Sequence, residues 1–397
     1  MPSLSARSAS LNESAIRKLD ALVAARPQIS FYRVNIGQPD VATPAPMLEA
    51  LRGFQEEVLR YGPASGLPAC RKAAARYHGA WSDALGPEHV AVTTGGSEAL
   101  IYAFAVACDP GDEILAPEPF YTNYLGFACT VGAKIVPVRT SIQDGFALPS
   151  NAKLEAQLTS RTRAVVFANP GNPTGAVYPR SDLERLTAFC EKHGLLIISD
   201  EVYRRIFFGN APASILEIPK ARQRSICVDS MSKTWSACGL RLGFLISHNL
   251  KIMKAVERLG QSRLGPQPLA QAAAVAALEL GPEHYSQTRA LYKERIDALL
   301  EGLGEIPGVS VHRPEGAFYL MVKLPVDDTE AFARFLAHEF SHQGESIVVA
   351  PGGGFYTDPS HGKQLIRLAA VLEPKKLRRA ADLLKLGLQA YTHDQAD

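Results

Sequence analysis

The stretch at residues 163–200 reads RAVVFANPGNPTGAVYPRSDLERLTAFCEKHGLLIISD. Its two ends, 163–169 and 194–200, are nearly continuous apolar runs, which is typical of strands that are buried on both faces. Residues 181–194 between them have helical periodicity, and Ser181 with Glu184 has the pattern of an N-terminal capping box. A strand, a helix and a second strand in this order predict a parallel sheet that is covered by helices.

The same alternation extends on both sides of this stretch. Earlier in the chain, a helical pattern at 97–108 follows the strand candidate 89–94, and further helical stretches separate other apolar runs. We therefore expect an α/β fold with a mainly parallel sheet. The remaining strand candidates are 89–94, 112–117, 133–138, 224–230 and 242–247.

The character of the chain changes after a long helical stretch at 283–304. Shorter strand and helix patterns follow, which predicts a smaller α+β unit. We expect a large domain at 44–288 and a small domain made of residues 1–43 and 289–397. The strand candidates of this small domain are 316–324, 346–351 and 363–371, and its helices are expected near 328–342 and 374–391.

The composition excludes several classes of protein. The 397 residues are 46% hydrophobic and 21% charged, which is globular rather than disordered or fibrous. A net charge of +2 gives no basic excess for nucleic acid, and no apolar run is long enough to cross a membrane. The first twenty residues lack the apolar core of a signal peptide, and six scattered cysteines without a C-x-x-C motif are typical of reduced thiols. We therefore expect a cytoplasmic protein.

The segment DSMSKTWSACGLRLGF, residues 229–244, carries the strongest chemical pattern. Ser230, Ser232 and Arg241 could hold a phosphate while the amine of Lys233 stays close to a carbonyl. Taken alone, the same lysine could be a solvated side chain in a serine-rich turn.

Three further segments follow strand candidates. TTGGSEAL (93–100) would point the backbone N–H groups of Gly96, Ser97 and Glu98 at an anion. In ANPGNPTG (168–175) and SDEVY (199–203), Asn172 and Asp200 stand at the carboxyl ends of strands, where open α/β sheets bind ligands.

Together these segments resemble the class I/II aminotransferases of fold type I, which depend on pyridoxal 5'-phosphate (PLP). The motifs occur in the order of that family, with 28 residues from Asn172 to Asp200 and 33 from Asp200 to Lys233. The resemblance covers nearly the whole chain and implies a seven-stranded, mainly parallel sheet between helices. It also implies a homodimer with shared active sites.

The resemblance assigns a role to each matching residue. Lys233 would bond to the cofactor aldehyde and act as general base, and Asp200 would hold the pyridinium nitrogen protonated. Asn172 and Tyr203 would hydrogen-bond the phenolic oxygen of the ring. Tyr121, in PEPFYTNY (117–124), would stack on the ring. The remaining implied contacts are Gly96, Ser97, Glu98, Ser230, Ser232 and Arg241 to the phosphate, Tyr61 to the phosphate of the neighbouring subunit, and Gly37 and Arg367 to the substrate.

The implied activity is transfer of an amino group from an L-amino acid to a 2-oxo acid by a ping-pong mechanism. Motifs such as NIGQPD (35–40) resemble those of bacterial aspartate aminotransferases most, so the expected substrates are aspartate and glutamate. A dicarboxylic substrate needs a second cation, for which Arg263 is a candidate. Aromatic, kynurenine or alanine aminotransferases, C–S lyases, cyclases and a non-enzymatic ligand-sensing domain remain alternatives.

Two other motifs carry no assignment. HEFSH (338–342) matches the H-E-x-x-H zinc pattern on an expected helix, but the residue at 345 is Glu where the extended motif needs Gly. We expect no metal site there. PGGGFY (351–356) lacks a strand–turn–helix context and predicts a loop near the active site.

Overall fold

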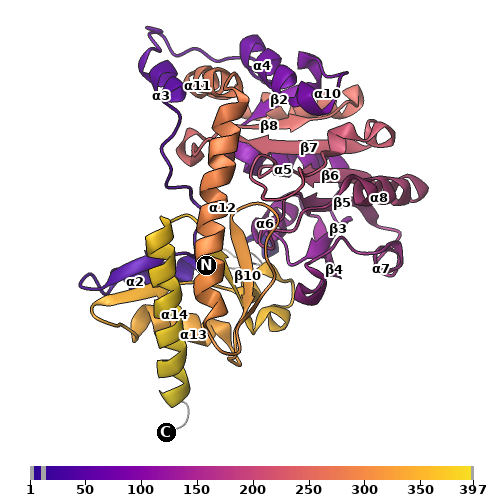
Figure 1. Cartoon of the computed structure of the whole chain (residues 1–397). Coiled ribbons are helices and arrows are strands. Elements are labelled where there is room, and N and C mark those ends of the chain that lie inside the picture. The colour runs from indigo at the N-terminus through magenta and orange to yellow at the C-terminus, as the bar shows by residue number, and fades with distance from the viewer. Residues whose placement is uncertain (1–3, 10–14, 395–397) are drawn as a thin grey trace.

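The computed structural model describes residues 4–9 and 15–394. A seven-stranded sheet of order β2-β8-β7-β6-β5-β3-β4 forms the centre of the larger unit (Figure 1). The neighbours from β7 to β4 pair in parallel, whereas β8 runs antiparallel to both β2 and β7. The predicted α/β fold is confirmed, and every strand candidate of this sheet lies within two residues of its observed position. The strands are β2 (Val90–Thr93), β3 (Glu113–Glu118), β4 (Lys134–Arg139), β5 (Thr162–Ala168), β6 (Leu196–Asp200), β7 (Ser225–Ser230) and β8 (Gly243–Ile246).

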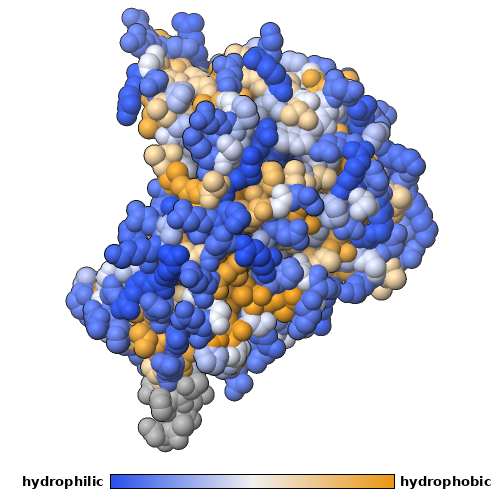
Figure 2. Space-filling view, in the orientation of Figure 1, coloured by the Kyte–Doolittle hydropathy of each residue, from blue (hydrophilic) through white to orange (hydrophobic). Residues whose placement is uncertain are grey.

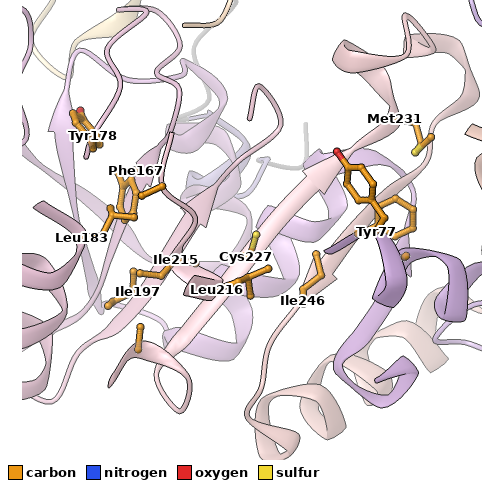
Figure 3. Close-up of a cluster of buried hydrophobic side chains, with 14 of the residues drawn as sticks. Tyr77, Phe167, Tyr178, Leu183, Ile197, Ile215, Leu216, Cys227, Met231 and Ile246 are labelled. Carbon is orange, nitrogen blue, oxygen red and sulfur yellow. The ribbon is translucent and has the colours of Figure 1, made fainter. Parts of the chain in front are cut away.

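Each face of this sheet packs against its own layer of helices. Successive strand residues alternate between two buried clusters: Val165 and Ile197 belong to one, and Val166 and Ile198 to the other. Figure 3 shows the first cluster, in which Ile197, Cys227 and Ile246 come from three neighbouring strands. Its helices are α4 (Pro68–His78), α7 (Asn151–Glu155), α8 (Arg180–Lys192) and α11 (Pro268–Leu278), and the other face is covered by α5 (Gly95–Ala107), α6 (Asn123–Val131) and α10 (Leu250–Arg263).

The predicted capping box at the start of α8 is wrong. The helix begins at Arg180, and the backbone N–H groups of Asp182 and Leu183 already donate to the carbonyl of Pro179. The ring of Pro179 presets the backbone for a helix start two residues earlier than a cap at Ser181 would. Glu184 consequently pairs with Arg180 one turn away, at 2.8 Å, instead of capping the helix.

The smaller unit contains two further sheets around a third apolar cluster. β1 (Ser30–Arg33) pairs in parallel with β11 (Glu345–Val348), so the N-terminal segment joins the C-terminal part of the chain. The second sheet has the order β12-β13-β10-β9. Its strands are β9 (Ser310–Val311), β10 (Tyr319–Lys323), β12 (Ala350–Pro351) and β13 (Leu365–Ala369), and the helices around the two sheets are α2 (Ala15–Ala24), α13 (Thr329–His338) and α14 (Pro374–Asp394).

The expected strand at 346–351 is divided between these two sheets. Its first part belongs to β11 and its last part to β12. The expected helix near 328–342 ends earlier, at His338, because the backbone N–H groups of Glu339 and Phe340 both turn back to the carbonyl of Phe335. The two histidines of HEFSH therefore do not share a helix face.

The helix α12 (Pro282–Gly304) links the two units (Figure 1). Tyr285 near its start packs in the first cluster of the large sheet, whereas Tyr292 and Ile296 pack in the cluster of the smaller unit. We propose that the domain boundary near residue 288 lies at this change of packing partner. Of the N-terminal part assigned to the small domain, residues 1–3 and 10–14 lie outside the described residues, as do residues 395–397 at the other end.

Two short helices, α1 (Ala6–Ala9) and α3 (Ala45–Arg52), complete the N-terminal part of the described chain, and α9 (Met231–Thr234) lies in the candidate site. Over the described ranges, the helices are all too short or too polar to cross a membrane. Figure 2 shows a mostly hydrophilic face, with hydrophobic residues gathered mainly between the two units.

Candidate active site

A cavity of about 750 Å³ lies at the carboxyl ends of the central strands. Asp200 ends β6, Ser230 ends β7, and Asn172 follows β5, so the parallel arrangement brings these three residues to one edge of the sheet. The smaller unit closes the cavity with residues from β10, β13 and the N-terminal segment. Twelve residues that the sequence assigned to the site line this cavity: Gly37, Gly96, Ser97, Tyr121, Asn172, Asp200, Tyr203, Ser230, Ser232, Lys233, Arg241 and Arg367.

A buried carboxylate lies at one end of the cavity. Asp200 is 4% exposed, and burial raises the pKa of its carboxyl to about 6. Three groups oppose this rise: the hydroxyl of Tyr124 donates to Oδ2 at 2.8 Å, the backbone N–H of Val202 donates to Oδ1, and the positive charge of Lys233 favours the carboxylate. A carboxylate that is held this deeply is well placed to pair with a cationic N–H group of a ligand.

A second group of residues that line the cavity is suited to bind an anion. Gly95 begins α5 at a φ of +78°, and a β-carbon there would lie 2.6 Å from the Nη2 atom of Arg241. Glycine therefore lets the guanidinium lie directly against the N-terminus of the helix, where free backbone N–H groups attract negative charge. The hydroxyls of Ser230 and Ser232, 2.9 Å apart, stand beside it in the same cavity.

The amine of Lys233 lines the same cavity, and its positive charge acts on the carboxyl of Asp200. Its Nζ donates a hydrogen bond of 2.8 Å to the carbonyl oxygen of Gly37 and lies 3.9 Å from the sulfur of Cys238. α9, which carries the lysine, is capped at its N-terminus by Ser230, whose side-chain oxygen accepts the backbone N–H of Ser232. The amine is thus half-buried and in contact with the N-terminal segment across the cavity.

A guanidinium from the smaller unit completes the cavity. Arg367 of β13 is 4% exposed and donates to Oδ1 of Asn172 at 3.1 Å and to the carbonyl of Asn35 at 2.6 Å. Its charged group lies between the rings of Tyr319 and Phe355, at 4.4 and 4.8 Å from their centres. Its Nε has no hydrogen-bond partner among the described residues, so a planar anion in the cavity would complete its bonding.

Three tyrosines surround the centre of the cavity. Tyr121 meets Tyr124 edge to face, and burial raises the pKa of Tyr121 to about 12. The hydroxyl of Tyr203 lies 2.8 Å from that of Tyr319, and burial raises the pKa of Tyr203 well above its ordinary value. Tyr121 and Tyr203 are therefore neutral phenols at physiological pH.

Two predicted cofactor contacts do not line the cavity of this chain. The carboxylate of Glu98 accepts the backbone N–H of Thr94 and pairs with Arg263 at 3.2 Å. These two contacts hold it at the start of α5, away from the cavity lining. Tyr61 is 83% exposed, on the surface of the larger unit. Arg263, the candidate for a distal carboxylate, also donates to the carbonyl of Ala64 and does not line the cavity.

Several residues of the site were not predicted. Tyr124 and Tyr319 donate or share hydrogen bonds with predicted residues, Asn35 accepts from Arg367, and Cys238 lies beside Lys233. Tyr124 stands three positions after Tyr121, and a buried helical pattern could have placed both on one face of a helix. Asn35 and Cys238 lie within the quoted motifs 35–40 and 229–244, and Tyr319 lies in the expected strand 316–324, but no contact was assigned to them.

The residues of the cavity fit PLP. The buried carboxylate of Asp200 suits the pyridinium end, and the cup of Arg241, the serines and the start of α5 suits a phosphate. Lys233 lines the same cavity, so its amine suits an aldehyde on the ring.

An α/β fold with a lysine, a buried carboxylate and an anion cup at one sheet edge defines a class of PLP-dependent enzymes. The chain belongs to the class I and II aminotransferase family, whose model matches residues 31–384. It is a PLP-dependent aminotransferase, an enzyme that transfers nitrogenous groups.

Three similar proteins illustrate the relationship. An aspartate aminotransferase of Thermotoga maritima is 32% identical over 355 residues, covering 89% of this chain and 90% of the relative. An aspartate/prephenate aminotransferase of Thermus thermophilus is 30% identical, covering 91% of this chain and 92% of the relative. The solved structure of an alanine aminotransferase from Pyrococcus furiosus matches with a TM-score of 0.88 at 30% identity, covering 98% of this chain and all of that one.

Proposed function

We propose that this aminotransferase moves the amino group of L-aspartate or L-glutamate to a 2-oxo acid by a ping-pong mechanism, with Lys233 as the proton-transferring residue. The observation that carries the proposal is that the Lys233 amine lines one cavity together with the carboxylate of Asp200 and the guanidinium groups of Arg241 and Arg367. The aspartate preference rests on the names of the relatives.

Each charged residue of the cavity has one task in this proposal. When bound, PLP withdraws electrons from the α-carbon of the substrate and stabilises the negative charge that forms there. Arg241 with Ser230 and Ser232 binds its phosphate, and Asp200 holds the proton on its ring nitrogen. Arg367 binds the α-carboxylate of the amino acid, which orients the α-hydrogen toward Lys233.

Lys233 then moves the proton. Its amine takes the α-proton as general base and later returns a proton as general acid; water then supplies the oxygen of the 2-oxo acid as the C–N bond of the substrate breaks, and the amino group stays with the bound cofactor. The carbonyl of Gly37, 2.8 Å from Nζ, holds the amine in the cavity and brings the N-terminal segment over the substrate. The phenol of Tyr203 and the amide of Asn172 hydrogen-bond the phenolic oxygen of the ring.

We also propose a homodimer in which Tyr61 binds the phosphate of the neighbouring subunit. Around it, Val58 is 58% exposed, Leu59 74% and Leu264 47%. The two segments that carry these side chains touch, because a β-carbon on Gly265 would collide with the carbonyl of Gly62. A continuous exposed apolar patch of this kind supports a contact with a second copy of the chain.

The homodimer also bears on substrate choice. The cations that line the cavity within the described chain are Lys233, Arg241 and Arg367, and each already has a task. The proposal therefore places the cation for the distal carboxylate of aspartate on the neighbouring subunit. Sedimentation of the active enzyme as a dimer, and mixed dimers of Tyr61→Phe with Lys233→Ala subunits, test this arrangement.

We further propose that the enzyme works in the cytoplasm. Cys70, Cys108, Cys190 and Cys227 are buried thiols, and burial raises the pKa of Cys70 to about 12, which keeps its sulfur protonated and unreactive. Thiols of this kind suit a reducing compartment. Cell fractionation followed by immunodetection tests this assignment.

The experiment that tests the function is a titration of the visible absorbance of the purified holoenzyme. We expect L-aspartate to bleach the band of the bound cofactor and a 2-oxo acid to restore it. A panel of glutamate, alanine, kynurenine and aromatic donors ranks the alternatives by the rate of bleaching. If no amino donor bleaches the band while 2-oxo products or sulfide are released, the enzyme catalyses elimination and not amino transfer.

A further inference from the structure

We infer that Tyr319 is a positioning residue, which donates a hydrogen bond to the hydroxyl of Tyr203 and thereby keeps the single proton of Tyr203 directed into the cavity. The inference rests on the proposed function, in which Tyr203 donates to the phenolic oxygen of PLP. It adds a residue from the smaller unit to a contact that otherwise belongs to the larger one.

The position of Tyr319 is defined on three sides. It begins β10, is 2% exposed, and its hydroxyl lies 2.8 Å from that of Tyr203, 116 positions away. Its ring lies over the guanidinium of Arg367 at 4.4 Å, and it meets the ring of Tyr203 edge to face at 5.6 Å. A β-carbon on Gly37 would collide with its hydroxyl, so the backbone that accepts from Lys233 rests directly on this phenol.

The two hydroxyls have only each other as hydrogen-bond partners within residues 4–9 and 15–394. Both tyrosines also line the cavity. Neither hydroxyl therefore donates a hydrogen bond to a third group of the described chain. The direction of the bond between the two decides which proton faces the cavity.

The number of protons determines that orientation. A phenol has one proton to donate and an oxygen that accepts. If Tyr203 donated to Tyr319, it would have no proton left for an acceptor in the cavity. When Tyr319 donates instead, the proton of Tyr203 is free to point inward, and accepting a hydrogen bond polarises its O–H group into a stronger donor.

The surroundings keep Tyr203 in the protonated state that the inference requires. Burial raises the pKa of Tyr203 well above its ordinary value, so Tyr203 stays protonated at neutral pH. The charged side chain packed closest to the pair is Arg367, whose positive charge favours oxygen lone pairs that face it. Tyr121 is the third phenol near Tyr203, and burial raises its pKa to about 12, so Tyr121 is neutral as well.

The test compares Tyr319→Phe, Tyr203→Phe and the double variant as holoenzymes. Tyr319→Phe keeps the ring that packs on Arg367 and Gly37 and removes only the oxygen. The measurement is the visible absorbance of bound PLP as a function of pH. Donation to the phenolic oxygen stabilises its anionic form, so a weaker donor raises the pH at which the bound cofactor loses its proton and changes colour.

We expect Tyr319→Phe to raise the midpoint of this colour change by roughly half a pH unit and Tyr203→Phe to raise it by more. The double variant should match Tyr203→Phe alone, because Tyr319 acts through Tyr203. Tyr292→Phe is the matched control. Tyr292 is 1% exposed, does not line the cavity and has a hydroxyl without a partner in the described chain. The midpoint of the colour change in this variant should equal that of the wild type.

The outcomes separate this inference from the proposed function. A shift in Tyr203→Phe without one in Tyr319→Phe overturns the role of Tyr319 and leaves the proposed function intact. Shifts that add in the double variant also overturn it, because they show that Tyr319 acts independently of Tyr203. An unshifted midpoint in Tyr203→Phe overturns both the donation from Tyr203 to the phenolic oxygen and the role of Tyr319. The absence of any visible band after addition of PLP overturns the proposed function itself.

Discussion

The hydroxyl of Tyr124 donates a hydrogen bond of 2.8 Å to Oδ2 of Asp200, across 76 positions of the chain. Tyr124 lies in α6 on one face of the sheet, and Asp200 ends β6 at its edge. The bond stabilises the charged form of a carboxylate that burial otherwise drives toward its neutral form. The helix layer thus helps to set the charge of the residue that faces the pyridinium end of the cofactor.

Replacing Tyr124 by Phe should weaken cofactor binding. The carboxylate of Asp200 would lose one hydrogen bond, so its pKa would rise and its charged form would become scarcer. Loss of one hydrogen bond to a charged group costs about 2 kcal/mol, which predicts a dissociation constant for PLP higher by roughly thirtyfold. Equilibrium titration of the cofactor-free variant measures this change. In an Asp200→Asn background, Tyr124→Phe should have little further effect, and an equal effect in both backgrounds would contradict the prediction.

The stability of the cofactor-free protein should fall with rising pH because of Asp200. Burial raises the pKa of this carboxyl from its ordinary value of 3.8 to about 6 in the folded chain. Between these values the native state holds a proton that the unfolded state has lost, so the free energy of unfolding decreases as pH rises from about 4 to about 6 and then levels off.

Urea denaturation of the cofactor-free wild type and Asp200→Asn at a series of pH values checks this. The stability of the wild type relative to the variant should decline up to about pH 6 and stay constant above it. A difference that is independent of pH would show that Asp200 titrates at its ordinary value.

Replacing Lys233 by Ala should abolish turnover and leave the fold intact. The variant loses the proton-transferring amine together with its bond to the carbonyl of Gly37. A fall of roughly 10³-fold or more in the rate with L-aspartate is expected from the loss of a general base that also binds the cofactor. Lys233→Arg keeps the positive charge and should fail equally, because a guanidinium does not release its proton. Turnover near the wild-type rate in either variant would refute the role of Lys233.

Replacing Arg367 by Lys should raise the KM for the amino donor much more than the dissociation constant of PLP. A lysine cannot form two parallel bonds to a carboxylate, nor stack between Tyr319 and Phe355 as the planar guanidinium does. A loss of about 2 kcal/mol predicts a KM higher by roughly thirtyfold. Arg334→Lys on the exposed face of α13 is the control. A change in cofactor affinity as large as the change in KM would place Arg367 at the cofactor rather than at the substrate.

Replacing Arg204 by Met should destabilise the protein strongly. Arg204 is 4% exposed and joins Glu201, Asp229 and Nδ1 of His78 behind the ends of β6 and β7. Its removal leaves buried carboxylates without their cation, which costs about 3–5 kcal/mol of unfolding free energy.

Chemical denaturation of the holoenzyme measures this loss. The control is Arg180→Met, which breaks an ion pair whose two side chains are both about half exposed and should cost less than about 1 kcal/mol. Equal effects of the two substitutions would show that the buried cluster contributes no more than a surface pair.

The large sheet was predictable from the sequence because its signal is local. Strands such as β5 and β6 are buried on both faces, so each appears as an apolar run of five to seven residues between helical patterns. The motifs that follow these strands identified Asn172, Asp200 and the segment around Lys233, because a parallel sheet brings its carboxyl ends to one edge. Local rules failed where two signals competed, as at Pro179 and Ser181.

The smaller unit and the pairings within the cavity depended on more than local signal. The stretch 346–351 appears as one strand, yet it serves two sheets, and only the position of β1 and β13 beside it decides where one ends. Arg263 had the right charge for a distal carboxylate, but its guanidinium forms an ion pair with Glu98 and does not line the cavity.

By itself, the sequence determined the α/β alternation, the family and the residue types that meet PLP, because these depend on periodicity and on short motifs. The tertiary structure alone decided that Tyr124 supports Asp200, that Tyr319 meets Tyr203 and that Lys233 contacts Gly37. These partners are separated by 76, 116 and 196 positions. Side-chain patterns along a chain reflect its own helix or strand period, whereas contacts across such distances depend on how whole layers pack against each other.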